Sequence, residues 1–346
     1  INDIDVYSQD IGLIAIADGD HLQGFNVLLG GGLGCSQGDL ATFPRLGDVA
    51  GYVPADQVIT IAETIVAIQR DYGDRENRRH ARFKYTVDDR GVDWMRDEIE
   101  RRSGIQLDAP RPFTFEGNGD QFGWRQQTDG RYQRVVFIEN GRLWKPAREV
   151  MATIVAHHAD SIRITPNHNL VIAGIDPSEC SRIDSVLREA GLDEANRSAL
   201  RVHAMACVAF PTCSLAMAES ERYMPTLMNS IEDLASRHGL DGEPITIRMS
   251  GCPNGCSRPY LSEIAFVGRA PGRYNMYLGA AFDGSRLNRL YLDNVAEPRI
   301  LEVIDELFGR YAGNRHDNEH FGDYLVRSGV IAPTTHGSET NVEGAL

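Results

Sequence analysis

GFNVLLG at residues 24–30 is followed, after a gap of about 240 residues, by the similar string RYNMYLG at residues 273–279. Each copy is an apolar, strand-like run that ends at a glycine and is followed by an apolar helix that begins near a proline. Solenoid repeats are only roughly 20–50 residues long, so the longer period indicates a duplicated domain. The alternative is that two unrelated hairpins share one turn chemistry. Duplication predicts two similar domains, related by a pseudo-two-fold axis, with a ligand between them.

Between the two copies, at about residues 122–192, the pattern of the chain changes. A strand at 135–138 and a helix at 149–157 precede two strands joined by the turn PNHN, and a second helix ends at Gly191. This β-α-β-β-α order indicates part of a ferredoxin-like α+β unit. The sequence therefore predicts an α+β protein with three domains: a first core domain at 1–121, a ferredoxin-like half-domain at 122–192 and a second core domain at 193–346.

The composition indicates a globular protein with an acidic surface. Hydrophobic residues make up 42% and charged residues 24% of the 346, which is ordinary for a folded chain. The 49 Asp and Glu against 35 Lys and Arg give a net charge of −14, which disfavours nucleic acid and anionic membranes as partners. With no apolar run of about 18 residues and no export signal, the expected compartment is cytoplasmic. A start at Ile1 suggests a fragment or a processed chain.

Four of the six cysteines form the strongest chemical signal. Cys207 and Cys213 are separated by five residues, and Cys252 and Cys256 by three. In a reducing compartment such cysteines are metal ligands or buried thiols rather than disulfides. Four thiolates from two segments can close a tetrahedral zinc site or hold the four irons of a cubane cluster. Structural zinc prefers closer pairs than the first one, so the spacing favours a 4Fe–4S cluster, with zinc and unligated core cysteines as the alternatives.

Three strings make the pattern more specific: ACVAFPTC at 206–213, GCPNGC at 251–256 and APGRYN at 270–275. With them the chain resembles the siroheme and 4Fe–4S sulfite and nitrite reductase family, and within it the hemoprotein (beta) subunit of assimilatory sulfite reductases. The resemblance runs from NDID at 2–5 to FGDY at 321–324, but covers only the C-terminal two-thirds or so of such a subunit. It implies that the two core domains are sulfite/nitrite reductase domains.

The resemblance implies two cofactors. Cys207, Cys213, Cys252 and Cys256 would hold a 4Fe–4S cluster, and the thiolate of Cys256 would also be the axial ligand of a siroheme iron, which makes Cys256 the catalytic residue. A thiolate shared by cluster and macrocycle couples the two, so electrons can pass singly to a substrate. The implied reaction is the six-electron reduction of sulfite to sulfide in sulfate assimilation and cysteine biosynthesis.

Contacts with the macrocycle are implied as well. Siroheme carries several carboxylates, which an acidic protein holds with a concentrated basic surface, ideally of arginines. The sequence has a basic stretch at residues 70–84, and the expected contacts in it are Arg75, Arg78, Arg79, Arg82 and Lys84. Arg82 matches a family lysine that contacts the cofactor, and Asn254 would position the ring or the bridging thiolate. The alternatives are a solvated helix end for the cations and a turn-forming role for Asn254.

The expected partners are sulfite and an electron donor, either a flavoprotein subunit that uses NADPH or ferredoxin. Two other functions remain open: siroheme-dependent reduction of nitrite to ammonia, and a non-catalytic four-cysteine protein that carries metal or serves as a scaffold. The glycine run at 30–34 lacks the lysine of a P-loop, so it predicts a close approach to the macrocycle. The family's upstream basic residues that bind sulfite have no counterpart here, so we expect impaired sulfite turnover by this chain alone.

Overall fold

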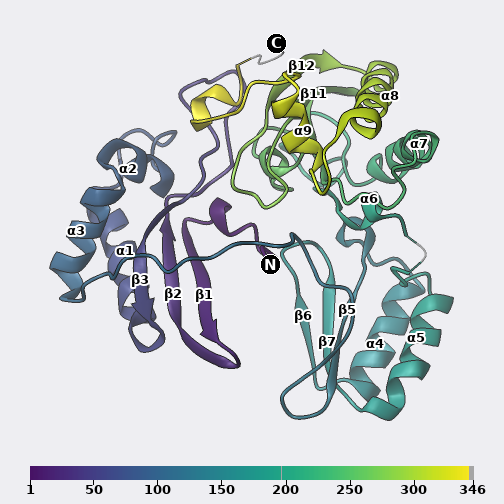
Figure 1. The fold of residues 1–346 in the computed structure, drawn as a ribbon, viewed down its shortest axis with the longest axis horizontal. Coiled ribbons are helices and arrows are strands. Elements are labelled where there is room, and N and C mark those ends of the chain that lie inside the picture. Colours follow the sequence, from purple (N-terminus) through teal and green to yellow (C-terminus); the bar gives the residue numbers. More distant parts are fainter. Residues whose placement is uncertain (196, 343–346) are drawn as a thin grey trace.

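A computed structural model describes residues 1–195 and 197–342, and its first unit is a three-stranded antiparallel sheet backed by helices. The strands lie in the order β1 (Ile11–Asp18), β2 (His21–Leu29) and β3 (Asp48–Pro54), and the helices are α1 (Val58–Tyr72), α2 (Phe83–Arg90) and α3 (Val92–Ser103). Apolar side chains of α1 such as Ile61, Ile65 and Ile68 are buried, together with strand residues such as Val27 and Val53. The sheet face that does not carry the helices is turned toward the middle of the molecule (Figure 1).

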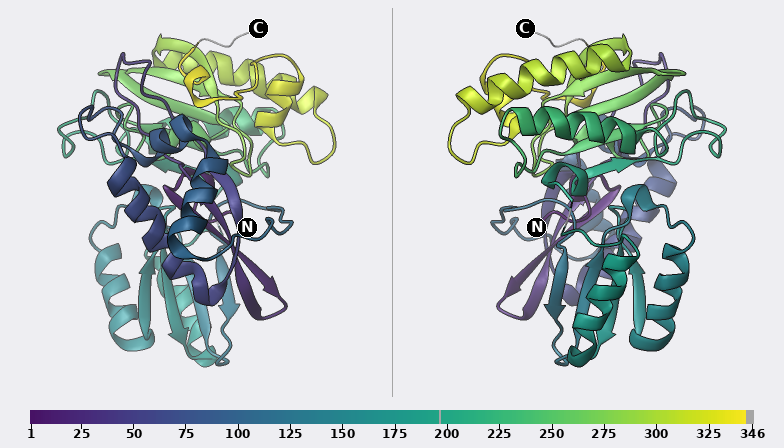
Figure 2. Two further views of the ribbon diagram at one scale, coloured as in Figure 1. Left: turned by 90° about the vertical axis from the view of Figure 1, so that its left-hand side faces the viewer. Right: turned by 90° about the vertical axis from the view of Figure 1, so that its right-hand side faces the viewer.

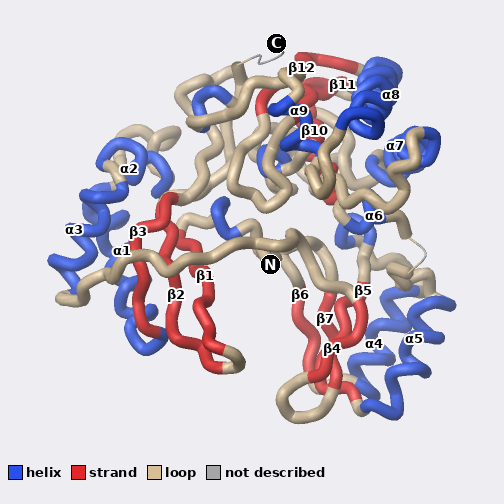
Figure 3. The backbone as a smooth tube through the Cα atoms, viewed as in Figure 1, coloured by secondary structure: helices blue, strands red, loops and turns tan. Residues whose placement is uncertain are grey.

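The second unit is a four-stranded antiparallel sheet with two helices on its outer face (Figures 1 and 3). Its strand order is β4 (Gly123–Gln126), β5 (Tyr132–Val136), β7 (Leu170–Ile175) and β6 (Ser161–Ile164), with α4 (Ala147–His158) and α5 (Cys180–Glu189) packed on it. The order β-β-α-β-β-α contains the predicted β-α-β-β-α series and adds β4, a short strand that the sequence analysis missed.

The third unit has five strands in the order β12-β11-β10-β9-β8. Its elements in chain order are α6 (Ala199–Val202), β8 (Ala204–Ala206), α7 (Met224–Arg237), β9 (Ile247–Ser250), β10 (Ile264–Ala270), β11 (Arg273–Leu278), β12 (Arg289–Val295), α8 (Glu297–Asn314) and α9 (Phe321–Arg327). β8 and β9 are parallel, β9 and β10 are parallel, and the other neighbours are antiparallel. The largest apolar cluster of the molecule lies between this sheet and α7, α8 and α9.

The first and third units share one plan, as the repeat in the sequence predicts. In both, a meander of three antiparallel strands is followed by a long helix: β1-β2-β3 and α1 in the first, β10-β11-β12 and α8 in the third. The two repeated strings end at Gly30 and Gly279, whose φ angles are 79° and 88°. A Cβ at Gly30 would lie 2.6 Å from Val87, and one at Gly279 would lie 2.7 Å from Ile331. The α+β class and the duplicated core are therefore confirmed.

The three sheets fall one within each predicted domain, whereas the domain boundaries themselves stay predictions. The three units surround the N-terminal segment, which the two side views show from opposite directions (Figure 2). Asn2 pairs with Asn118 as an isolated bridge, and its side chain donates to the Asp283 carbonyl at 2.9 Å. Residues from three distant parts of the chain thus meet at its start. Among the helices described, none has the combination of length and apolar character that a membrane span requires.

Candidate functional site

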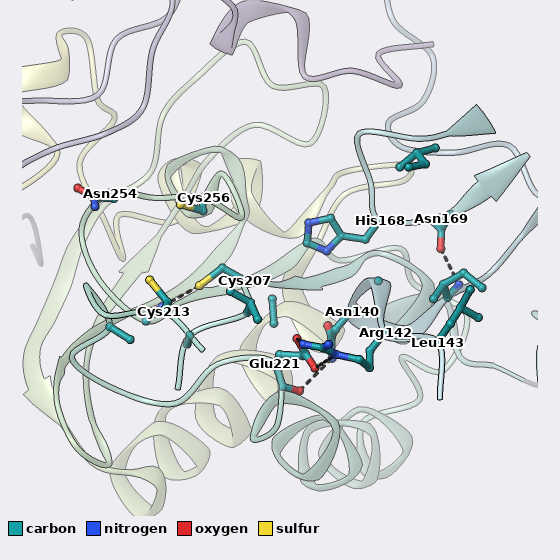
Figure 4. A pocket seen from close by; sticks show the side chains of 18 of the residues that line it. Asn140, Arg142, Leu143, His168, Asn169, Cys207, Cys213, Glu221, Asn254 and Cys256 are labelled. Atoms are coloured by element: carbon teal, nitrogen blue, oxygen red, sulfur yellow. Dashed lines mark hydrogen bonds and ion pairs between the residues drawn. The ribbon is translucent and has the colours of Figure 1, made fainter. Parts of the chain in front are cut away.

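All four predicted cysteine ligands line one cavity of about 610 Å³. Cys207 and Cys213 lie in the connection between β8 and α7, and Cys252 and Cys256 lie in the loop that follows β9. β8 and β9 are parallel neighbours, so both loops leave the sheet at the same edge. The opposite wall of the cavity comes from the second unit, around residues 138–143 and 164–170. Figure 4 shows the cavity from close by.

Backbone hydrogen bonds fix the two cysteine loops. The Cys207 N–H donates to the Met249 carbonyl at 3.1 Å and continues the β8–β9 pairing. The loop after β9 consists of two successive turns: the Gly255 N–H donates to the Cys252 carbonyl at 3.3 Å, and the Arg258 N–H donates to the Gly255 carbonyl at 2.8 Å. Cys256 therefore lies at a corner of the second turn, where its side chain is exposed.

The thiols lie close enough to influence one another. The Gly251 N–H donates to Sγ of Cys207 at 3.2 Å (Figure 4). Burial raises the pKa of Cys252 and of Cys256, and the neighbouring thiols raise both further. Because metal ligands must be thiolates, binding a cluster here would release protons.

Four thiols on one cavity match the ligand set of a 4Fe–4S cluster. Within residues 1–195 and 197–342, no three His, Cys, Asp or Glu side chains are gathered around one metal-ion position. Zinc requires four sulfurs at about 2.3 Å from one point. The four irons of a cubane lie apart from one another and each takes one thiolate, so a cluster suits ligands spread along a cavity wall.

The glycine run connects the first unit to the cysteine loop. The Cys35 N–H donates to the Pro253 carbonyl at 3.0 Å, and a Cβ at Gly34 would lie 3.3 Å from the Asn254 carbonyl oxygen. A Cβ at Gly32 would lie 3.2 Å from Nη2 of Arg82. The structure therefore brings Arg82, the glycine run and the Cys252–Cys256 loop together, although they are distant in the sequence.

The five predicted cations differ in their surroundings. Arg82 is exposed and pairs with Asp10 at 3.2 Å, and Arg79 pairs with Asp39 at 2.9 Å. Arg75 donates to the carbonyls of Gln69 and Arg70, and Arg78 is exposed. Lys84 is fully buried, and its Nζ donates to the carbonyls of Gly32, Gly34 and Phe43. Contacts of all five with a macrocycle stay predictions.

Three residues on the cavity wall were missed or set aside by sequence reasoning. Arg142 donates two hydrogen bonds to the Glu221 carboxylate, at 2.6 and 2.8 Å, and the Glu221 N–H donates to the Cys207 carbonyl at 3.0 Å. His168 lines the cavity with a φ of 69° (Figure 4). Burial and the nearby Arg258 and Arg248 lower its pKa to about 4. The PNHN turn was the only signal in the sequence for His168.

The sequence of this chain is similar to a known protein family and to named proteins. A family model described as the nitrite and sulphite reductase 4Fe-4S domain matches residues 1–107, which are the first unit rather than the cysteine loops. The sulfite reductase [NADPH] hemoprotein beta-component of Bordetella petrii is 53% identical over 347 residues, covering 99% of this chain. That of Methylocella silvestris is 51% identical and covers 98%.

The chain belongs to the sulfite and nitrite reductase family. This member of the family spans 59% of the length of the Bordetella petrii protein and 60% of the Methylocella silvestris protein. The solved structure of the Mycobacterium tuberculosis NirA protein superimposes with a TM-score of 0.80 at 26% identity, over 94% of this chain and 61% of that one. The resemblance drawn from the cysteine strings is confirmed, and so is the sulfite and nitrite reductase fold.

Proposed function

We propose that this chain is the part of an assimilatory sulfite reductase hemoprotein that holds a 4Fe–4S cluster and siroheme. The observation that carries the proposal is the convergence of Cys207, Cys213, Cys252 and Cys256 on one cavity. Together the two groups supply single-electron transfer to a bound anion, which suits the six-electron reduction of sulfite to sulfide.

The protein's own residues provide the ligands and the surroundings. The four thiolates would hold the cluster, and Cys256, the exposed one, would also face the siroheme iron. Arg82 lies beside Gly32 of the glycine run, where its guanidinium could bind a carboxylate of the macrocycle. Asn254, exposed beside Cys256, would position the ring or the shared thiolate. The apolar side chains around the cavity, such as Leu143 and Ile164, would exclude water from the cluster.

The named relatives favour sulfite and an NADPH-linked donor. Both relatives quoted are called sulfite reductase [NADPH] hemoprotein beta-component. We therefore propose a flavoprotein subunit that carries electrons from NADPH as the partner, with ferredoxin as the other candidate donor. The proposed setting is sulfate assimilation for cysteine biosynthesis in the cytoplasm, where thiol ligands stay reduced.

Absorption spectroscopy tests the cofactors. The chain is reconstituted anaerobically with iron, sulfide and siroheme, and is then desalted. We expect intense visible bands from the macrocycle on top of a broad cluster absorbance. In Cys256→Ser the macrocycle bands should be lost or shifted, whereas Cys180→Ser on α5 should match the unmodified chain. A spectrum with no macrocycle bands in the unmodified protein, or unchanged bands in Cys256→Ser, would contradict the proposal.

Nitrite is the second candidate substrate, because the matching family is described as reductases of both anions. Reduction of sulfite and of nitrite can be compared with reduced methyl viologen as donor, so that no natural partner is needed. We expect a higher kcat/KM for sulfite, and slower turnover by this chain than by a polypeptide of the relatives' full length. Preference for nitrite, or equal turnover by both polypeptides, would contradict these two expectations respectively.

A further inference from the structure

A buried group of three charges lies behind the turn that carries Cys256. The Asp5 carboxylate is inaccessible to solvent, and one of its oxygens accepts from Nη1 of Arg248 at 2.6 Å and from Nε of Arg258. The Arg248 side chain is only 4% exposed. Asp5 comes from the N-terminal segment, Arg248 from β9 and Arg258 from the cysteine loop, so the group joins two of the three units.

Arg258 extends the connection to the second unit. Its Nη2 donates to the Pro166 carbonyl at 2.9 Å and to Oδ1 of Asn167 at 3.0 Å, in the turn between β6 and β7. Its backbone N–H closes the turn at whose corner Cys256 lies, and its own carbonyl accepts from Arg248 at 3.2 Å. The guanidinium and the backbone of Arg258 are thus both fixed, and the direction of the Cys256 side chain depends on them.

The backbone and the charge count indicate a role beyond ordinary packing. Asp5 and Arg258 adopt φ angles of 49° and 53°, left-handed values that are unfavourable for a non-glycine residue. Taking charges out of water is also unfavourable, and a buried ion pair by itself is weak evidence for added stability. Two guanidinium groups face one carboxylate, so the group carries a net positive charge, and Arg258 follows Cys256 by two residues in the chain.

We propose that Asp5, Arg248 and Arg258 are positioning residues that orient Cys256 and hold one uncompensated positive charge beside the iron site. In water-poor surroundings, a fixed positive charge favours the electron-rich state of a cluster. Asp5 and Arg258 therefore have opposite effects on the reduction potential, although they act together on the geometry. The inference rests on the proposed cluster site.

Reduction potentials test the charge. The 346-residue chain is loaded with its cluster, and the midpoint potential is followed by EPR-monitored titration. Asp5→Asn removes the compensating carboxylate, so we expect a shift to more positive potential. Arg258→Gln removes a cation, so we expect a shift to more negative potential, whereas Arg258→Lys should stay near the unmodified value. Asp3→Asn, an exposed carboxylate two residues from Asp5, is the matched control.

Iron release to a chelator tests the positioning. Arg258→Lys keeps the charge but cannot reach Asp5 and the β6–β7 turn at once, so we expect its iron to be lost about tenfold faster than from the unmodified chain. Arg258→Lys also tests whether Arg258 positions Cys256 if Arg258→Gln does not fold. The double variant with Asp5→Asn should lose iron little faster than Arg258→Lys alone, because the two residues act through one contact.

The outcomes separate this inference from the proposed function. If the unmodified chain takes up no iron, both fall. If it takes up a cluster but Asp5→Asn and Arg258→Gln move the potential in the same direction, or not at all, the charge assignment is wrong. If Arg258→Lys releases iron no faster than Asp3→Asn, the positioning assignment is wrong.

Discussion

Lys84 is one of only two lysines in the chain, and its ammonium group is enclosed by three carbonyls. The sequence analysis placed it on a basic surface because it follows a run of arginines. Sequence alone does not distinguish the two environments, because an ammonium can be held by backbone carbonyls as well as by solvent or a ligand. The carbonyls belong to the glycine run and to residue 43, so in this structure Lys84 holds the glycine run in place.

Replacement of Lys84 tests this structural role. In Lys84→Met three carbonyls lose their donor, and we expect the free energy of unfolding to fall by about 1–3 kcal/mol at pH 7. Urea denaturation of the cofactor-free chain measures it. Lys145→Met, which alters a lysine whose side chain is 71% exposed, should change stability by less than about 0.5 kcal/mol. Equal stabilities for the two variants would show that Lys84 is not needed to hold the glycine run.

The burial of His203 predicts that the folded protein loses stability in acid. Burial, with Arg248 and His320 nearby, lowers the pKa of His203 to about 4 in the folded state, against 6.5 for the free side chain. Between these values the unfolded chain binds the proton and the folded chain does not, so the contribution of His203 to stability is present above pH 6.5 and is lost as the pH falls toward 4. His203→Gln should therefore show a smaller loss of stability from pH 7.5 to 5 in urea unfolding. His21→Gln, at an exposed position, should keep the original slope.

At the scale of elements, long apolar runs were predicted well and short or fully buried elements poorly. The strand-like run at residues 24–30 is the end of β2, and the apolar helix expected after residues 273–279 is α8. β4 and β8 have four and three residues, too few for an alternating pattern to show. α2 buries five consecutive residues, from Phe83 to Val87, and so has no helical period to recognise.

The close packing of Gly279, at the end of the second repeated strand, can be tested by substitution. Gly279→Ala would place a methyl 2.7 Å from Ile331 at a φ of 88°, whereas Gly272→Ala meets no atom within 4 Å at a φ of 67°. We expect Gly272→Ala to cost about 1–2 kcal/mol from the backbone alone. Gly279→Ala should cost roughly 1–3 kcal/mol more, because the core must be displaced. Thermal unfolding measures both, and equal costs would mean that Ile331 moves aside freely.

At the scale of the whole molecule, the cysteines were predicted from the sequence but the residues that support them were not. Cys207, Cys213, Cys252 and Cys256 form two spaced pairs that can be recognised locally, and they line one cavity as expected. Asp5 and Arg258 lie 253 positions apart, and neither stands in a pattern of its own. Only the folded chain shows that they meet, because three units must first be assembled around the N-terminal segment.

The Arg142–Glu221 ion pair holds the second unit against the loop that carries Cys207. Glu221 is buried, and its N–H is bonded to Cys207 while its carboxylate binds Arg142. In Glu221→Gln the doubly hydrogen-bonded ion pair is lost, so we expect faster amide exchange in residues 138–143 and in the Cys207 loop. Hydrogen-exchange mass spectrometry measures this. Glu219→Gln alters a more exposed carboxylate that pairs with Arg222, and should leave both segments unchanged.

The position of Asp5 also bears on when the site forms during synthesis. Its carboxylate has no arginine partner until residues 248 and 258 have been made, about three-quarters of the way along the chain. Contacts of such long sequence separation form late, because a large loop must close before they contribute. The cysteine turn therefore gains its final shape only after Arg258 has been made, and stable metal loading is expected after that point rather than before it.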